Sequence, residues 1–180
     1  WWRHYGELAR QNLPTLRDPD RLTYWKEEVG GLVMGGYEPN PLPWAIDGFP
    51  EGFEFQLLED DLDHFEPLLE LAAGRVPAMQ TAGIKEFING PESFTPDGNF
   101  ILGEAPYDLW PVDIRRFGKN HLDTNWVRTR TLEAYAKHYT MAWPFEEYLS
   151  GRPLRRSPLW DRLKAQYACF GEKLGWERPN

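Results

Sequence analysis

The amino-acid sequence predicts an α+β fold, in which a mostly antiparallel sheet with helices on one face is followed by a small, mainly helical second domain. Two features of the chain support this prediction. The 180 residues include 16 glycines and 16 prolines, which favour a loop-rich mixed fold over a helical bundle. Short runs with strand character occur in the first half of the chain, and helical spacing of apolar residues becomes frequent after Trp110.

Four segments of the first half are predicted to form the sheet. Residues 22–27 and 31–38 are strand-like runs joined by a glycine-containing turn, which indicates a β-hairpin. Residues 84–89 and 99–102 return to strand character further along the chain. Residues 39–50 contain four prolines and are expected to be an extended loop.

The segment from about residue 61 to 74 predicts an amphipathic helix on one face of this sheet. Asp60 and Asp61 precede its apolar positions, where the helix dipole favours acidic residues. Pro67 complicates the prediction, because a proline inside a helix costs roughly 3 kcal/mol. A helix that starts near Glu66 and ends at Gly74 is therefore the safer version.

Other helical segments are expected at the start of the chain and after Trp110. Residues 5–11 have helical character, and residues 125–139 carry aromatic and apolar residues at near-helical spacing. Ser157-Pro158 suits a helix start, with serine as N-cap and proline at the first position, and this helix should run to about residue 169 or 173. Residues 151–158 are expected to be an extended connector. These changes predict a domain boundary near residue 108.

Composition and charge exclude several classes of function. The net charge is −8 without a basic block, which argues against nucleic acid as the main partner. No apolar run approaches about 18 residues, so no membrane-spanning helix is expected. The N-terminus has no signal-peptide organisation and no initiating methionine, so we expect a non-secreted chain that starts inside a longer protein. Five arginines could together form a phosphate-binding patch, but acidic residues near them in the sequence make ion pairs between domains the favoured interpretation. These arginines are Arg115, Arg116, Arg152, Arg155 and Arg156.

The nine residues from Gly90 to Gly98 are the strongest candidate for a binding loop. Two glycines and two prolines exclude a regular helix or a central strand. Pro96-Asp97-Gly98 suits a tight turn, because proline presets φ, aspartate caps locally and glycine accepts a positive φ. Rigid loops at strand ends often carry binding groups, although an ordinary hairpin turn would have the same sequence features.

This loop resembles the flavin-proximal loop of the dimethylglycine and sarcosine dehydrogenase family. The similar residues are Phe94-Thr95-Pro96-Asp97-Gly98, followed by Ile101-Leu102-Gly103-Glu104-Ala105-Pro106. These enzymes are FAD-dependent amine oxidoreductases of the D-amino-acid-oxidase type. The resemblance extends in the family's order from Leu13 to Asn180 and takes in residues 13–20, 30–39, 112–117, 150–159 and 175–179.

The resemblance implies two parts with different roles. Residues 1–107 would be the substrate-binding portion of an FAD-dependent oxidoreductase, and residues 108–180 a central connector domain that leads toward an aminomethyltransferase-like, folate-binding domain. The implied cofactors are FAD in the complete protein and tetrahydrofolate at a domain outside this chain. The implied substrate is a small N-methyl amino acid, dimethylglycine or sarcosine, while the electron acceptor stays open. The implied location is the bacterial cytoplasm or the mitochondrial matrix.

The resemblance also implies which residues form the site. Tyr24 matches a family tyrosine that faces the flavin, so it would be the catalytic and substrate-orienting residue, and Tyr37 could line the same cavity. On the residues alone, an ordinary cross-strand aromatic is the favoured interpretation of Tyr24, and only the resemblance makes the catalytic role its equal. The flavin would be approached by the backbone and short side chains of the loop, namely Phe94, Thr95, Pro96, Asp97 and Gly98.

Two departures from the family leave a second function open. The chain has no Gly-x-Gly-x-x-Gly turn of the kind that binds the FAD pyrophosphate. The relatives also carry several dozen further residues where Pro106-Tyr107 here runs directly into Asp108-Leu109. The alternative is therefore a non-catalytic relative that acts as a binding protein, like the regulatory subunit of pyruvate dehydrogenase phosphatase.

Overall fold

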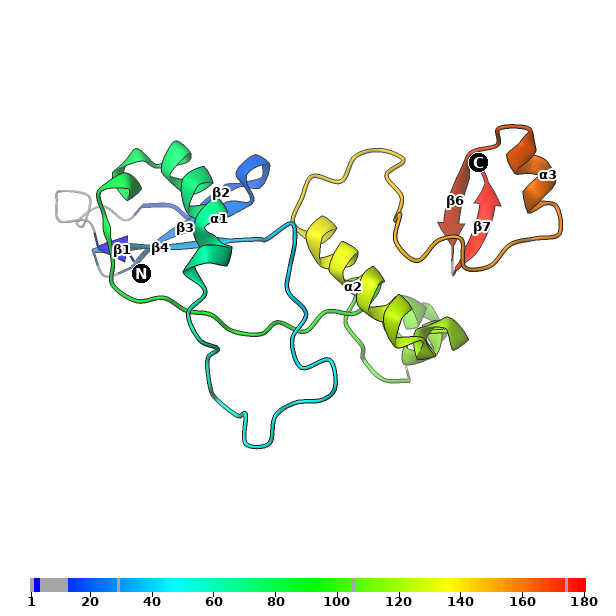
Figure 1. Ribbon diagram of the computed structural model, residues 1–180, viewed down its shortest axis with the longest axis horizontal. Coiled ribbons are helices and arrows are strands. Elements are labelled where there is room, and N and C mark those ends of the chain that lie inside the picture. The colour runs from blue at the N-terminus through cyan, green and yellow to red at the C-terminus, as the bar shows by residue number, and fades with distance from the viewer. Residues whose placement is uncertain (1, 4–12, 29, 105, 174) are drawn as a thin grey trace. The chain divides into compact units, whose positions relative to one another are not determined.

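The computed structural model describes residues 2–3, 13–28, 30–104, 106–173 and 175–180 (Figure 1). The helix expected over residues 5–11 lies outside these residues. The described chain groups into two compact units, one formed by Trp1–Ser93 with Tyr139–Met141 and the other by Phe94–His138 with Ala142–Asn180. This spatial division falls at Ser93, earlier than the boundary expected near residue 108. None of the described helices has the length and apolarity needed to cross a membrane.

The first unit contains a five-stranded antiparallel sheet in the order β2-β3-β4-β1-β5. The strands are β1 (Trp2–Arg3), β2 (Leu16–Asp18), β3 (Thr23–Glu28), β4 (Gly31–Gly36) and β5 (Gly83–Ile84). Strands β3 and β4 pair from Thr23↔Gly36 to Glu28↔Gly31, with Gly30 at a φ of 73° in the turn. The predicted hairpin is therefore confirmed, since glycine adopts this left-handed conformation without strain.

One face of this sheet packs against helix α1 (Leu62–Arg75) and forms the core of the first unit. Trp25 and Met34 are cross-strand partners, and both are buried against α1. The remaining buried members of the core are Leu68, Ala72 and Met79. Because side chains alternate across a strand, Tyr24 points to the opposite face from Trp25, as its position predicts.

Helix α1 begins at Leu62, although the safer sequence prediction placed its start near Glu66. Asp61 is the N-cap and accepts a hydrogen bond from the backbone N–H of His64 at 3.0 Å. Pro67 lies inside the helix. The start near Glu66 is wrong because this cap and the burial of the helix's apolar face on the sheet outweigh the cost of the proline.

Two of the predicted strands are not formed as expected. Of residues 84–89, only Ile84 belongs to a strand, the two-residue β5, and the carbonyl of Asn89 instead accepts the N–H of Leu58 at 2.8 Å. Residues 99–102 form no strand, and the N–H of Leu102 donates to Val112 O at 2.9 Å. Both segments have strand-forming side chains but no extended partner strand, which a sheet requires.

The second unit combines short helices with a C-terminal hairpin (Figure 1). Three 3-10 helices (Tyr107–Val112, Ile114–Arg116 and Lys119–Leu122) precede α2 (Thr124–His138), which confirms the helix predicted over residues 125–139. The last predicted helix was expected to run from Ser157-Pro158 to about residue 169 or 173. The observed helix, α3, is much shorter and spans only Trp160–Ala165. Strands β6 (Phe170–Lys173) and β7 (Trp176–Pro179) follow as an antiparallel hairpin that the sequence prediction missed. Gly175 lies in the turn between them at a φ of 80°.

Candidate functional site

Tyr24 lies on the face of the sheet that α1 does not cover. Its cross-strand partners are Arg17 on β2 and Gly35 on β4, so all three belong to one row across the sheet. The Tyr24 ring lies directly over Gly35, where a Cβ atom would collide with the ring. The absence of a side chain at position 35 therefore allows the Tyr24 ring to pack directly on the sheet.

Three tyrosine rings and one guanidinium gather beside this row. The Tyr24 and Tyr37 ring centroids are 5.4 Å apart, and Tyr37 stacks on Tyr139 at 3.6 Å with planes 10° apart. The guanidinium carbon of Arg17 lies 5.5 Å from the Tyr37 centroid and 5.9 Å from that of Tyr139. Its Nη2 donates a hydrogen bond to the backbone carbonyl of Tyr139 at 3.2 Å. We call Arg17, Tyr24, Tyr37 and Tyr139 the tyrosine cluster.

The cluster presents neutral hydroxyl groups beside a positive charge. Burial raises the pKa of Tyr24, and the neighbouring Tyr37 and Glu92 raise it further. Burial also raises the pKa of Tyr139, and so does Glu92. Both phenols are therefore protonated hydrogen-bond donors at neutral pH. Among the residues that the structure describes, no carboxylate lies within ion-pair distance of Arg17, so its charge is free to bind an anionic group.

The loop at residues 94–98 belongs to the second unit and forms the predicted tight turn. Gly98 has a φ of 72°, and its N–H donates to Thr95 O at 3.1 Å. The Thr95 hydroxyl lies 2.9 Å from Asp97 Oδ1 and 2.7 Å from Asn99 O. Asp97 Oδ1 also accepts the N–H of Asn99 at 3.2 Å, so the polar side chains of the loop bond within the loop. Contrary to the hairpin interpretation, neither flank of the turn is a strand.

Asp97 is held by a buried arginine from the neighbouring 3-10 helix. Arg116 Nε lies 2.7 Å from Asp97 Oδ2, and Nη2 lies 3.1 Å from Oδ1. The same Nη2 donates to Asn99 O at 2.9 Å. Burial would raise the pKa of Asp97, but hydrogen bonds from Arg116, Thr95 and Asn99 outweigh it and hold that pKa below its usual value.

Phe94 anchors the loop on α2. Its ring meets Tyr135 edge-on at 4.9 Å and His138 at 5.5 Å between centroids. Because the side chains of Phe94, Thr95 and Asp97 are engaged inside the unit, the loop has its backbone and the half-buried Pro96 left to meet a ligand.

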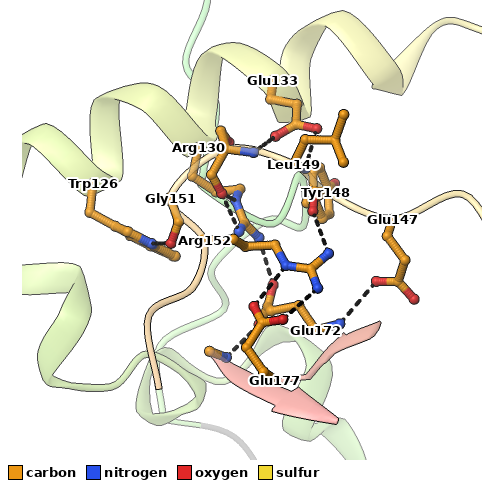
Figure 2. A network of polar contacts seen from close by, with 12 residues as sticks. Trp126, Arg130, Glu133, Glu147, Tyr148, Leu149, Gly151, Arg152, Glu172 and Glu177 are labelled. Carbon is orange, nitrogen blue, oxygen red and sulfur yellow. Dashed lines mark hydrogen bonds and ion pairs between the residues drawn. The ribbon is translucent and has the colours of Figure 1, made fainter. Parts of the chain in front are cut away.

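The arginines that were expected to form ion pairs between domains instead pair within the second unit, and Figure 2 shows part of this network. Arg130 on α2 lies 2.7 Å from Glu172, and Arg152 binds both carboxylate oxygens of Glu177 at 2.8 and 2.7 Å. Figure 2 shows both guanidinium groups pointing toward the β6–β7 hairpin. Arg115 and Arg116 are likewise paired with aspartates. The paired arginines are therefore structural, and no cluster of His, Cys, Asp or Glu in the described part of the chain could hold a metal ion.

Comparison with known proteins places these features in a family. Residues 102–157 match the FAD-dependent oxidoreductase central domain. The mitochondrial sarcosine dehydrogenase of Mus musculus is 36% identical over 206 residues, which cover 94% of this chain and 22% of the relative. The formaldehyde-forming 4-methylaminobutanoate oxidase of Paenarthrobacter nicotinovorans is 35% identical over 208 residues, 96% of this chain and 25% of the relative. The chain is homologous to the sarcosine and dimethylglycine dehydrogenases.

One of the proteins similar to this chain is named as a regulatory protein. The mitochondrial pyruvate dehydrogenase phosphatase regulatory subunit of Mus musculus is 34% identical over 213 residues, 98% of this chain and 24% of the relative. Sequence identity therefore does not separate the two functions expected from the sequence. The chain spans about a quarter of the length of each of these curated relatives.

The structure brings together some of the expected site residues of this oxidoreductase relative and adds others. Tyr24 and Tyr37 meet in the first unit, and Phe94, Thr95, Pro96, Asp97 and Gly98 form one turn in the second unit. Arg17 was not among the candidates from the sequence, and Arg116 was expected only to form an ion pair between domains. Both lie in segments that resemble the family, residues 13–20 and 112–117, which was the available signal for them.

Proposed function

We propose that this chain is part of an FAD-dependent oxidoreductase that demethylates a small N-methylated amino acid, dimethylglycine or sarcosine. The homologues support the broader class, since their printed names include sarcosine and dimethylglycine dehydrogenases and a 4-methylaminobutanoate oxidase. In this proposal the one-carbon unit passes to tetrahydrofolate at a domain outside these residues. Residues 1–107 serve as the substrate-binding portion and residues 108–180 as the connector.

The observation that carries the proposal is the tyrosine cluster. An N-methyl amino acid presents a carboxylate and an amine within a few ångströms of each other, so its site needs a cation and a hydrogen-bonding group close together. Arg17 supplies a guanidinium without a carboxylate partner in the described chain, and Tyr24 supplies a protonated hydroxyl one strand away. The stacked rings of Tyr37 and Tyr139 add an apolar surface suited to methyl groups.

In this mechanism Arg17 binds the substrate carboxylate and the Tyr24 hydroxyl orients the amine. FAD, when bound, accepts the hydride that leaves the carbon next to nitrogen. The aromatic rings exclude water, which strengthens both polar contacts. Phe94, Thr95, Pro96, Asp97 and Gly98 border the flavin through their backbone, while the pyrophosphate is bound by a part of the protein that carries a dinucleotide motif.

Anaerobic reduction of the flavin tests this function in the full-length protein. Addition of sarcosine or dimethylglycine should bleach the oxidised-flavin absorption band, whereas glycine, which has no methyl group to lose, should not. A full-length protein that binds flavin but is reduced by no N-methyl amino acid would contradict the proposal.

A non-catalytic binding protein is the second candidate, favoured by the similarity to the phosphatase regulatory subunit. The same preparation distinguishes the two, because a folded full-length protein without a flavin absorption band supports the binding protein. For either function we propose the mitochondrial matrix or the bacterial cytoplasm as the location, since relatives are named as mitochondrial and another comes from Paenarthrobacter nicotinovorans.

A further inference from the structure

The loop at residues 94–98 and the 3-10 helix Ile114–Arg116 meet through one side chain. The guanidinium of Arg116 binds Asp97 through two nitrogens and Asn99 O through one of them. Asp97 in turn accepts the N–H of Asn99 and bonds to the Thr95 hydroxyl. Arg116 therefore lies behind the loop and connects to it at three residues.

The position of this guanidinium is fixed independently of the loop. Arg116 Nη1 donates to the backbone carbonyl of Asp113 at 3.1 Å, and the guanidinium carbon lies 4.1 Å from the Phe117 ring centroid. Its side chain is only 5% exposed, whereas that of Asp97 is 36% exposed. A buried guanidinium with contacts on several sides keeps one conformation, so the more exposed aspartate adapts to the arginine.

We propose that Arg116 is a positioning residue that sets the conformation of the 94–99 segment through Asp97. The inference rests on the proposed function in one respect, namely that this segment borders the flavin. Arg116 itself meets no ligand, because its donors are engaged by the loop and by Asp113. Its contribution is to hold the backbone of the loop in the one arrangement that suits a ring system beside it.

Hydrogen–deuterium exchange in the flavin-free full-length protein tests the structural half of the inference. The N–H groups of Gly98 and Asn99 are bonded inside the loop, so they report on its conformation. In Arg116→Gln the peptide that covers residues 94–99 should exchange at least about tenfold faster, because a bidentate charge-assisted contact is lost. Strand β3 in the first unit serves as the internal reference and should not change.

Arg156→Gln is the matched control. It removes the same charge from an arginine of the same unit whose side chain is 52% exposed and lies 4.0 Å from Asp161, which is itself 85% exposed. Exchange in the 94–99 peptide should stay within about twofold of the unaltered protein. Asp97→Asn provides a second variant that keeps the shape of the loop, and it should accelerate exchange in the same peptide as Arg116→Gln does.

Flavin spectroscopy of the loaded protein tests the functional half. Arg116→Gln and Asp97→Asn should shift the flavin absorption maximum and slow flavin reduction by about tenfold, and the double variant should be no slower than either single variant. Arg156→Gln should do neither. Slower reduction with unaltered exchange, or faster exchange with an unaltered flavin spectrum and rate, would overturn the inference. If no N-methyl amino acid reduces the unaltered protein, the proposed function fails instead, and the exchange result still decides whether Arg116 sets the loop.

Discussion

The two units of this chain are held together by different physical interactions. The first unit buries apolar side chains between one face of its sheet and α1, with Trp25, Leu68 and Ala72 at the centre. The second unit buries two apolar residues, Ala134 and Trp160, and in addition two arginines, Arg116 and Arg130. Each buried arginine is paired with a carboxylate and with backbone carbonyls.

This difference teaches where each unit is vulnerable. Burial of apolar surface is non-directional and independent of pH, so the first unit depends on volume and shape. Buried ion pairs contribute little net stability but become strongly destabilising when one partner is removed, so the second unit depends on complete pairing. In return, paired charges hold specific conformations, which suits a unit that contains the loop that we propose borders the flavin.

The largest loss of stability is expected from Arg130→Ala. Arg130 Nη1 pairs with Glu172 at 2.7 Å and Nη2 donates to Ser150 O at 2.6 Å, so its removal leaves a buried carboxylate without its cation. We expect the second unit to lose about 3–5 kcal/mol of unfolding free energy. Urea denaturation, with hydrogen exchange of β6 and β7 as the local probe, measures it.

Arg156→Ala is the control for this variant. Arg156 lies 4.0 Å from Asp161, and the two side chains are 52% and 85% exposed. An exposed pair at this distance should contribute less than about 0.5 kcal/mol. Equal losses from the two variants would remove the distinction between buried and exposed pairs.

A loss of about 2–5 kcal/mol is expected from Leu68→Ala in the first unit. Leu68 is 3% exposed, and its methyl groups fill the space above Gly36, so truncation leaves a cavity under the sheet. Leu71→Ala on the same helix is the control, because Leu71 is 40% exposed and should cost much less. The loss should appear in urea denaturation and be the same at pH 7 and pH 5, because burial of apolar surface involves no titrating group.

Acid should weaken the second unit before the first. Burial would raise the pKa of Glu133, but hydrogen bonds from Lys137 and from the backbone N–H groups of Leu149 and Ser150 lower it to about 2. Hydrogen bonds from Arg130 and Gly175 likewise outweigh burial and lower the pKa of Glu172. A carboxyl group with a lowered folded-state pKa contributes stability above its unfolded pKa and loses it as pH falls.

The corresponding window runs from about pH 5 down to about pH 2, because the unfolded and folded values for Glu133 are 4.5 and about 2. Incubation across this range followed by a deuterium pulse at one fixed pH gives the opening of each unit separately. Protection in α2 and the β6–β7 hairpin should fall first, and protection in β3 and α1 later. Simultaneous loss in both units would show that the ion pairs do not set the acid limit.

The sequence predicted the parts of the fold that depend on local pattern. The β3–β4 hairpin has alternating side chains and a glycine turn, and α1 and α2 have helical spacing, so each could be located from neighbouring residues. The β6–β7 hairpin was missed because its position depends on distant partners. The backbone N–H of Arg155 donates to Gly175 O, and the backbone carbonyl of Arg155 accepts the N–H of Glu177. The Arg152 guanidinium binds the Glu177 carboxylate.

In the candidate site, too, the features that depend on local pattern were predictable and those that depend on distant partners were not. Strand alternation placed Tyr24 opposite Trp25, and turn chemistry predicted the conformation at Pro96-Asp97-Gly98. Arg17 joins Tyr24 through the short strand β2, and Tyr139 reaches the cluster from far along the chain. Neither partnership has a local signal, since both arise from packing between segments that are separate in sequence.

Tyr24→Phe should slow flavin reduction without changing the free energy of unfolding. This variant tests the contrast between the two faces of the sheet in the first unit, namely the apolar face that packs on α1 and the face that carries Tyr24. The ring stays over Gly35 and beside Tyr37, so unfolding free energy should change by less than about 0.5 kcal/mol. If the hydroxyl orients the substrate amine, its loss removes a hydrogen bond worth roughly 1.5–3 kcal/mol to a centre that develops charge. Flavin reduction in the full-length protein should then slow by about ten- to a hundredfold.

Stopped-flow reduction with sarcosine and with dimethylglycine measures this effect. Tyr167→Phe is the matched control, because it removes the same hydroxyl from a residue that is 93% exposed in the second unit, and it should leave the rate unaltered. If Tyr24→Phe reduced the flavin at the original rate, the hydroxyl would have no part in the reaction. If it instead lowered the unfolding free energy by more than 1 kcal/mol, on the order of a buried hydrogen bond, Tyr24 would belong with Trp25 among the residues that hold the sheet together.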